Sequence, residues 1–169
     1  MDDAAFDEVA LDTFEKSACT PKLDSDDFEG IRIAMPAKVS VSELERIPLC
    51  GVWSFSNAVL AKFPMVEDSL VFLARSVETH ETATGNFRTH KDPASAGEMK
   101  AGAAENAASA PPPAAGGEPV IGDEDITSRG YFNFNLGRVW EVPARPGRWR
   151  VHLVLHDVQS NEVQFEVVK

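Results

Sequence analysis

Two histidines, His80 and His90, stand at equal distances from a glycine in the stretch "HETATGNFRTH". If the chain folds back at Gly85, residues equidistant from it face each other, so that His80 faces His90 and Glu78 faces Asp92. Directly opposed Cβ atoms lie about 4.5–5.5 Å apart, a separation at which two imidazoles can hold one Zn²⁺ or Cu²⁺. The spacing therefore predicts a copper or zinc site, with a solvated hairpin tip as the alternative. Its ligands would be His80, His90, Glu78 and Asp92.

A second histidine pair, His152 and His156, lies in the stretch "VHLVLHD". This stretch has the alternating pattern of a strand, in which four residues at about 3.3 Å each separate the two imidazoles by roughly 13 Å. The pair cannot chelate one ion at that distance. We expect both histidines and Arg150 to form a polar stripe that faces solvent.

The aromatic run "GYFNFNLGRVW" is the best candidate for an interaction surface. Strand alternation turns Phe132 and Phe134 toward the core, so their polar and aromatic neighbours should point outward. Exposed Tyr, Trp, Asn and Arg are residue types that binding surfaces favour. The alternatives are an ordinary strand surface and, for the tryptophan, a place in the core. The predicted interaction residues are Tyr131, Asn133, Asn135, Arg138 and Trp140.

Motifs of catalysis are missing from the sequence. It holds no Gly-x-Ser-x-Gly elbow, phosphate-binding loop, dinucleotide fingerprint or His-Glu-x-x-His stretch. The acidic clusters "DDFEG" and "GDEDIT" do not have the spacing of a calcium loop. We therefore predict a non-enzymatic protein with no cofactor, no catalytic residues and no small-molecule substrate.

The net charge of −11 is concentrated at the N-terminus. Residues 1–29 hold ten acidic and two basic side chains, a balance of −8, and the rest of the chain is nearly neutral. Because phosphate binding needs clustered Lys and Arg, this distribution argues against a nucleic-acid partner. Residues 1–29 are predicted to be an acidic arm that is solvated or docks on a basic partner.

Two cysteines, Cys19 and Cys50, bear on the compartment. A disulfide between them would tie the arm to the body in an oxidising compartment, and two free thiols are the alternative. The acidic N-terminus lacks the basic start and apolar stretch of a secretory signal. By default this indicates a cytoplasmic protein, with a mature extracytoplasmic chain as the alternative. No apolar run approaches the roughly 20 residues of a membrane span.

The remaining sequence alternates with a period of two. Short apolar-polar runs are separated by turn residues on both sides of residues 92–119, of which 21 of 28 are Ala, Gly, Pro or Ser. Such a segment is too poor in large apolar residues to pack, and we predict a disordered insertion. Only residues 4–17 have helical spacing, which predicts a short helix. The run at residues 69–79 is apolar on both faces and predicts a strand covered on both sides. These patterns predict one antiparallel β-sandwich over residues 30–169, interrupted by the insertion.

The run "PGRWRVHLVLHDVQSNEVQFEVV" resembles the closing hairpin of immunoglobulin-like or fibronectin type III-like domains of bacterial proteins. In such domains a Pro-Gly turn starts a "W/Y-x-V-x-L" strand, and a Ser-Asn turn precedes a final "V-x-F-x-V" strand. The early run "IRIAMPAKVSVSELERIPLCGVW" is similar to their opening strands. The resemblance implies an immunoglobulin-like β-sandwich.

A binding or accessory module that recognises another protein is the leading functional prediction. It depends on the absence of a catalytic set together with a fold whose loops are suited to recognition. A copper- or zinc-binding protein is the second hypothesis, and a protease-inhibitor-like sandwich is the third.

Overall fold

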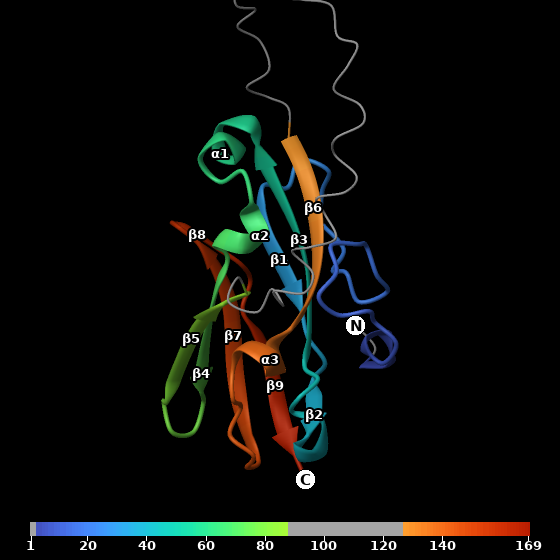
Figure 1. Ribbon diagram of the computed structural model, residues 1–169, viewed down its shortest axis with the longest axis vertical. Coiled ribbons are helices and arrows are strands. Elements are labelled where there is room, and N and C mark those ends of the chain that lie inside the picture. Colours follow the sequence, from blue (N-terminus) through green and yellow to red (C-terminus); the bar gives the residue numbers. More distant parts are fainter. Residues whose placement is uncertain (1–2, 88–126) are drawn as a thin grey trace, which may run out of the picture.

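The computed structural model describes residues 3–87 and 127–169, and in these ranges the chain is mostly β-structure (Figure 1). The strands form two sheets that pack against each other. The predicted all-β sandwich is thereby confirmed at the level of its two layers. The predicted insertion at residues 92–119 lies outside the described residues.

The smaller sheet contains β1 (Gly30–Ala34), β3 (Pro48–Ser56) and β6 (Thr127–Asn135). Its strands are antiparallel and lie in the order β1-β3-β6. The register pairs Cys50 with Asn133 and Val52 with Tyr131. Alternate residues of a strand share a face, so these four side chains lie on the outer face of the sheet, away from the sandwich core.

The larger sheet contains β2 (Lys38–Ser40), β4 (Val71–Ser76), β5 (Thr82–Asn86), β7 (Gly147–Leu155), β8 (Val158–Gln159) and β9 (Val163–Val168). Its order is β2-β9-β7-β4-β5, and β8 pairs with β7. The short strand β2 runs parallel to β9, whereas the other pairs are antiparallel.

The short helix η1 (Asp3–Phe6) precedes the first strand. The other short helices lie between strands: η2 (Val41–Glu43), α1 (Asn57–Lys62), α2 (Val66–Ser69) and α3 (Leu136–Val139). The helix α1 lies at one end of the sandwich, seen at the top of Figure 1, and α2 lies below it toward the middle of the molecule. Among the described helices, none has the length and apolar character to cross a membrane.

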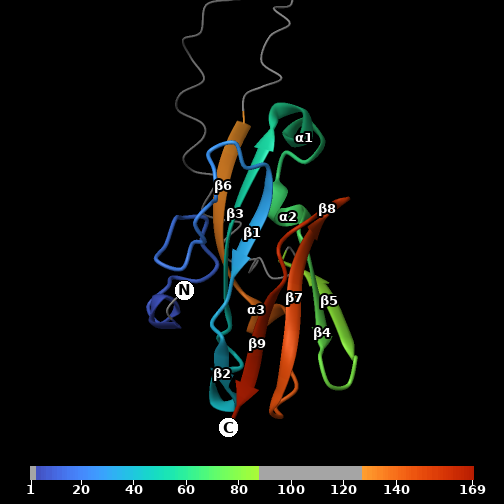
Figure 2. The ribbon, with the colours of Figure 1, turned by 180° about the vertical axis from the view of Figure 1, so that it is seen from behind.

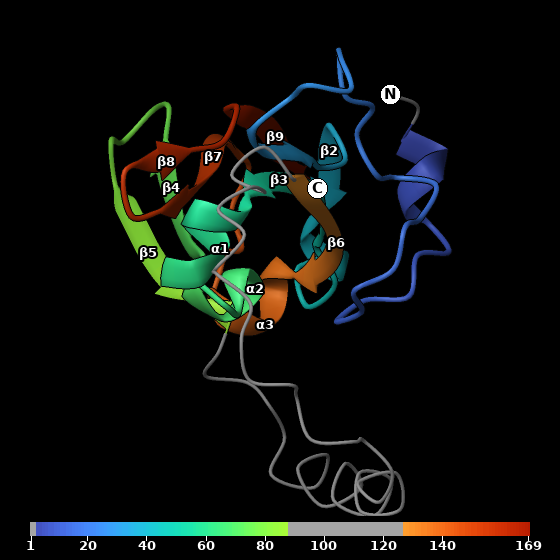
Figure 3. The same cartoon turned by 90° about the horizontal axis from the view of Figure 1, so that it is seen from above.

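Side chains from both sheets fill the space between the layers. Figure 3 shows the backbones of the two layers from above. Phe132 from β6 and Phe72 from β4 are both fully buried there. The ring of Phe132 lies over Gly51, where a Cβ atom would come within 2.0 Å of the ring carbon Cζ. Glycine is required at this position because the aromatic ring occupies the space of a side chain.

The N-terminal segment, residues 3–29, packs on the outer face of the smaller sheet (Figure 2). Phe6 and Val9 are buried against Cys19 and Cys50 in a second, small apolar cluster. The helix predicted over residues 4–17 is wrong beyond its first turn, since the chain leaves the helix after Phe6 and Asp12 has φ 60°. The apolar residues at helical spacing lie instead in a loop, and they pack against the sheet.

The hairpin β4–β5 turns at residues 77–81, which corrects the predicted turn at Gly85. Gly85 lies within β5 and pairs with Phe72 of β4. A Cβ atom at Gly85 would come within 2.6 Å of the Phe72 ring. Glycine therefore serves close packing here and not a reversal of the chain.

Candidate functional site

Asn133, a predicted interaction residue, is buried, with 1% of its surface exposed. Its amide nitrogen donates to the Thr13 hydroxyl at 3.0 Å and to the Glu15 carbonyl at 2.9 Å. Its amide oxygen accepts from the Ser17 hydroxyl at 2.8 Å. The backbones of Asn133 and Thr13 also form an antiparallel bridge. Asn133 thus holds the N-terminal segment along β6.

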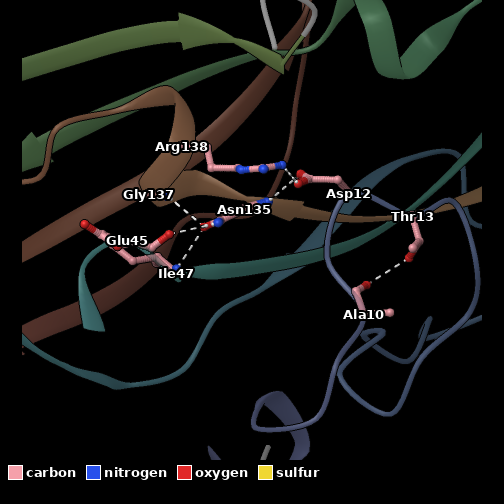
Figure 4. Close-up of polar contacts among 8 residues, drawn as sticks. All are labelled: Ala10, Asp12, Thr13, Glu45, Ile47, Asn135, Gly137 and Arg138. Atoms are coloured by element: carbon pink, nitrogen blue, oxygen red, sulfur yellow. Dashed lines mark hydrogen bonds and ion pairs between the residues drawn. The ribbon is translucent and has the colours of Figure 1, made fainter. Parts of the chain in front are cut away.

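Asn135 and Arg138 make a second attachment, drawn in Figure 4. The backbone N–H of Asn135 donates to the Asp12 carboxylate at 3.2 Å, and the Arg138 guanidinium donates to the same carboxylate at 2.6 Å. The Asn135 side chain forms hydrogen bonds with backbone groups of the loop before β3. It accepts from the Ile47 N–H at 3.0 Å and donates to the Glu45 carbonyl at 2.9 Å. Its polar groups are therefore used within the chain.

Trp140 is a core residue, 9% exposed, with its ring centroid 4.8 Å from that of Trp149 in a T-shaped contact. Tyr131 is half-buried on the outer face of β6. The strand alternation predicted for this run is right, but the prediction that its polar residues meet solvent is wrong for Asn133 and Asn135, which are buried, whereas Tyr131 and Arg138 are partly exposed. The N-terminal segment packs on that face, where the Asn133 side chain and the Asn135 backbone N–H bind it.

The predicted metal ligands do not take the predicted register. His80 lies in the turn of the β4–β5 hairpin, is exposed and has φ 61°, and Glu78 lies in the same turn. Their predicted partners His90 and Asp92 lie outside the described residues. In the part of the chain that the structure describes, no group of three or more His, Cys, Asp and Glu side chains is placed to hold a metal ion.

Cys19 and Cys50 form a disulfide, with their Cα atoms 5.9 Å apart. Both cysteines are fully buried. The bond joins the N-terminal segment to the central strand of the smaller sheet, on the face that Asn133 also contacts. Of the alternatives that the sequence leaves open, the structure contains the bridged form.

The outer face of the larger sheet carries partly exposed apolar side chains at one end. Val71 and Val154 oppose each other on β4 and β7, and Leu73 opposes His152 in the next row. Val71 is 37% exposed, and the other three side chains are half-buried. The expectation that residues 69–79 are covered on both sides is wrong, because β4 alternates between buried and exposed positions.

The other end of the same face is basic. Arg75 of β4 directly opposes Arg150 of β7, and both are exposed. Arg150 contacts Glu162 at 3.6 Å, whereas Arg75 makes no ion pair within residues 3–87 and 127–169. The two arginines and His80 line a depression of about 180 Å³ beside the hairpin turn. Like charges placed directly opposite each other destabilise a sheet, so this pair is suited to an anionic group from outside.

The turn beside the depression is fastened to the neighbouring strand. Glu78 accepts hydrogen bonds from Nε of Arg148 at 2.9 Å and from the Arg148 backbone N–H at 3.0 Å. These bonds hold the pKa of Glu78 below its ordinary value. Glu81 forms an ion pair with Arg145 at 2.5 Å. The two acidic residues of the turn, Glu78 and Glu81, thus pair with Arg148 and Arg145 and not with Arg75. Arg75 can therefore bind an anion from outside.

Part of this face was readable in the sequence. Arg150 and His152 share the outer face of β7 as expected, but His156, expected on the same stripe, lies in the turn after β7 and has φ 55°. What the sequence did not show is that β4 lies beside β7 and brings Arg75 opposite Arg150. Comparison with protein-family models, with curated proteins and with solved structures found no match for this chain.

Proposed function

We propose that this protein is a non-enzymatic binding module, and that the outer face of its larger sheet recognises an acidic segment of a partner protein. The opposition of Arg75 and Arg150 beside an exposed apolar patch carries the proposal. Two guanidiniums side by side can share carboxylates in charge-assisted hydrogen bonds. The apolar patch adds affinity that does not depend on charge.

We also assign the sandwich to the immunoglobulin-like class. In that class, strands A, B and E share one sheet and strands C, F and G share the other. Support comes from the strand order, in which β1, β3 and β6 take the places of A, B and E, and β4, β7 and β9 those of C, F and G. The disulfide departs from the class pattern, since it links β3 to the N-terminal segment and not to β7.

The order of basic and apolar side chains along β4 determines the order of acidic and apolar residues that a partner segment needs. From Arg75 to Val71 the four steps along β4 span about 13 Å at roughly 3.3 Å each. A matching segment in an extended conformation therefore carries acidic residues at one end and apolar residues about four positions away. The net charge of −11 of the whole protein disfavours acidic partners over most of its surface, so binding of an acidic partner depends on this face.

Fluorescence anisotropy with synthetic peptides of about ten residues tests the proposal. One peptide has an acidic half and an apolar half, a second has glutamines in place of the glutamates, and a third has the same composition in scrambled order. We expect the first to bind most tightly, with an affinity that falls as salt rises.

The protein variants separate this face from the rest of the surface. Arg75→Gln with Arg150→Gln should weaken binding by about tenfold or more, because both charged hydrogen-bond donors are lost. Arg129→Gln on β6 is the matched control and should bind as the unmodified protein does. Equal binding of the glutamate and glutamine peptides, or an unchanged affinity of the double variant, would overturn the proposal.

A further inference from the structure

A pocket lies on the opposite side of the molecule, between the N-terminal segment and the outer face of the smaller sheet. Residues 16–18 and 20–23 form one wall, and Val52 and Tyr131, which pair across β3 and β6, lie on the sheet side. Its volume is about 460 Å³. Pockets for small molecules commonly measure about 300–1,000 Å³, so the size suits a small organic ligand.

The wall is fixed in place before any ligand arrives. Cys19 is bonded to Cys50, and the Ser17 hydroxyl donates to Asn133 at 2.8 Å. Within the wall, the Ser17 N–H donates to the Thr20 hydroxyl at 2.9 Å, and the Thr20 N–H donates back to the Ser17 carbonyl at 3.1 Å. Because the wall is already ordered, the free-energy cost of ordering it when a ligand binds is small.

Positive charge gathers at the pocket although the protein is acidic. Lys16 and Lys22 are the only basic residues of residues 1–29, and both line it. Arg129 of β6 is the third cation, against one carboxylate, that of Asp26. No ion pair of either lysine occurs within the described ranges. Arg129 donates through one nitrogen to the Asp26 carbonyl at 3.1 Å and has further N–H groups for a ligand.

The sheet side of the pocket is aromatic and apolar. The half-buried ring of Tyr131 lies next to Val52, which is 1% exposed. One row along the same face, the buried Ser54 hydroxyl has no hydrogen-bond partner in the described part of the chain, and its residue pairs with Arg129. A flat apolar group can stack on the tyrosine while its charged end meets the three cations.

We propose that this pocket binds a small organic anion, a carboxylate or phosphate carried on a flat apolar group. Lys16, Lys22 and Arg129 neutralise the anionic end, and Tyr131 packs against the apolar body. This site is separate from the sheet face that carries Arg75, so the experiments on one site do not test the other.

The single tyrosine of the chain gives a direct reporter. Protein labelled with 3-fluorotyrosine shows one ¹⁹F signal, that of Tyr131. Benzoate and phenyl phosphate serve as the anionic probes, and benzyl alcohol is the neutral control. We expect a saturable shift with at least one anion and none with the alcohol, and the tighter of the two anions identifies the head group.

Variants connect the shift to the three cations. Lys22→Gln with Arg129→Gln should weaken anion binding by about tenfold or more, since two charge-assisted contacts are lost. Lys38→Gln, at an exposed position of β2 on the other sheet, is the matched control and should leave anion binding unchanged. Absence of any saturable shift, an equal shift with benzyl alcohol, or full affinity in the double variant would overturn the proposal.

Discussion

Asn133 and Thr13 bond to each other through both backbone and side chain, although 120 positions separate them in the chain. The Asn133 N–H donates to the Thr13 carbonyl at 2.9 Å, and its side-chain amide donates to the Thr13 hydroxyl at 3.0 Å. By these bonds the N-terminal segment covers the edge of β6, an edge that would otherwise offer unpaired backbone groups.

Replacing this buried asparagine should loosen the segment. Asn133→Ala removes the acceptor of the Ser17 hydroxyl and leaves groups of the segment without partners, at a cost of about 1–3 kcal/mol in the free energy of unfolding. Urea denaturation measures this loss. Gln164→Ala, an exposed position on β9, is the control and should change stability by less than about 0.5 kcal/mol. An equal, small effect of both variants would show that Asn133 does not anchor the segment.

The sequence contained the two-residue period of β6 and β7, which is a local property, and from this the two-layered β-fold was predictable. It did not show that the outward side chains of β6 meet the N-terminal segment, because that contact joins positions more than 100 residues apart. It also placed the hairpin turn at Gly85, since glycine favours turns. In the structure Phe72 requires this glycine, and the turn uses residues 77–81, which contain neither Gly nor Pro.

Reducing the disulfide should also destabilise the protein. The bond between Cys19 and Cys50 closes a loop across 31 positions, and such a crosslink contributes about 2–4 kcal/mol by restricting the unfolded chain. We expect a lower melting temperature in the presence of a phosphine reductant. Cys19→Ser should melt at a similarly lowered temperature, and the reductant should not lower it further. Identical melting of the oxidised and reduced protein would contradict a stabilising role for the bond.

The pairing of Glu78 with Arg148 predicts a pH dependence. Because these hydrogen bonds lower the pKa of Glu78 from 4.5, the unfolded state binds its proton more readily than the folded state. The stabilisation is therefore complete above pH 4.5 and is lost as the pH falls through the lowered folded-state value. Melting curves of the protein and of Glu78→Gln should differ near neutral pH and converge in acid. A difference that persists unchanged in acid would exclude Glu78 as its source.

Because Arg75 and Arg150 are directly opposed, we expect substitution of Arg75 to weaken partner binding but to raise the free energy of unfolding. Arg75→Thr removes a like-charge contact with Arg150 and places a residue that favours strands, so the free energy of unfolding should rise by about 0.2–1 kcal/mol. Arg75→Glu should stabilise the sheet at least as much, by pairing with Arg150. Urea denaturation at low and high salt checks both variants, and the gain should shrink in high salt. Loss of stability in both variants would mean that the guanidinium of Arg75 supports the fold.

We propose that the face formed by β4 and β7 recognises an acidic segment next to an apolar one. Backbone amide chemical shifts, recorded while the peptide with an acidic and an apolar half is added, test it most directly. We expect the shifts of residues 71–75 and 148–154 to change, with the acidic half nearest Arg75 and Arg150. Changes confined to β1, β3 and β6, or no change at saturating peptide, would contradict it.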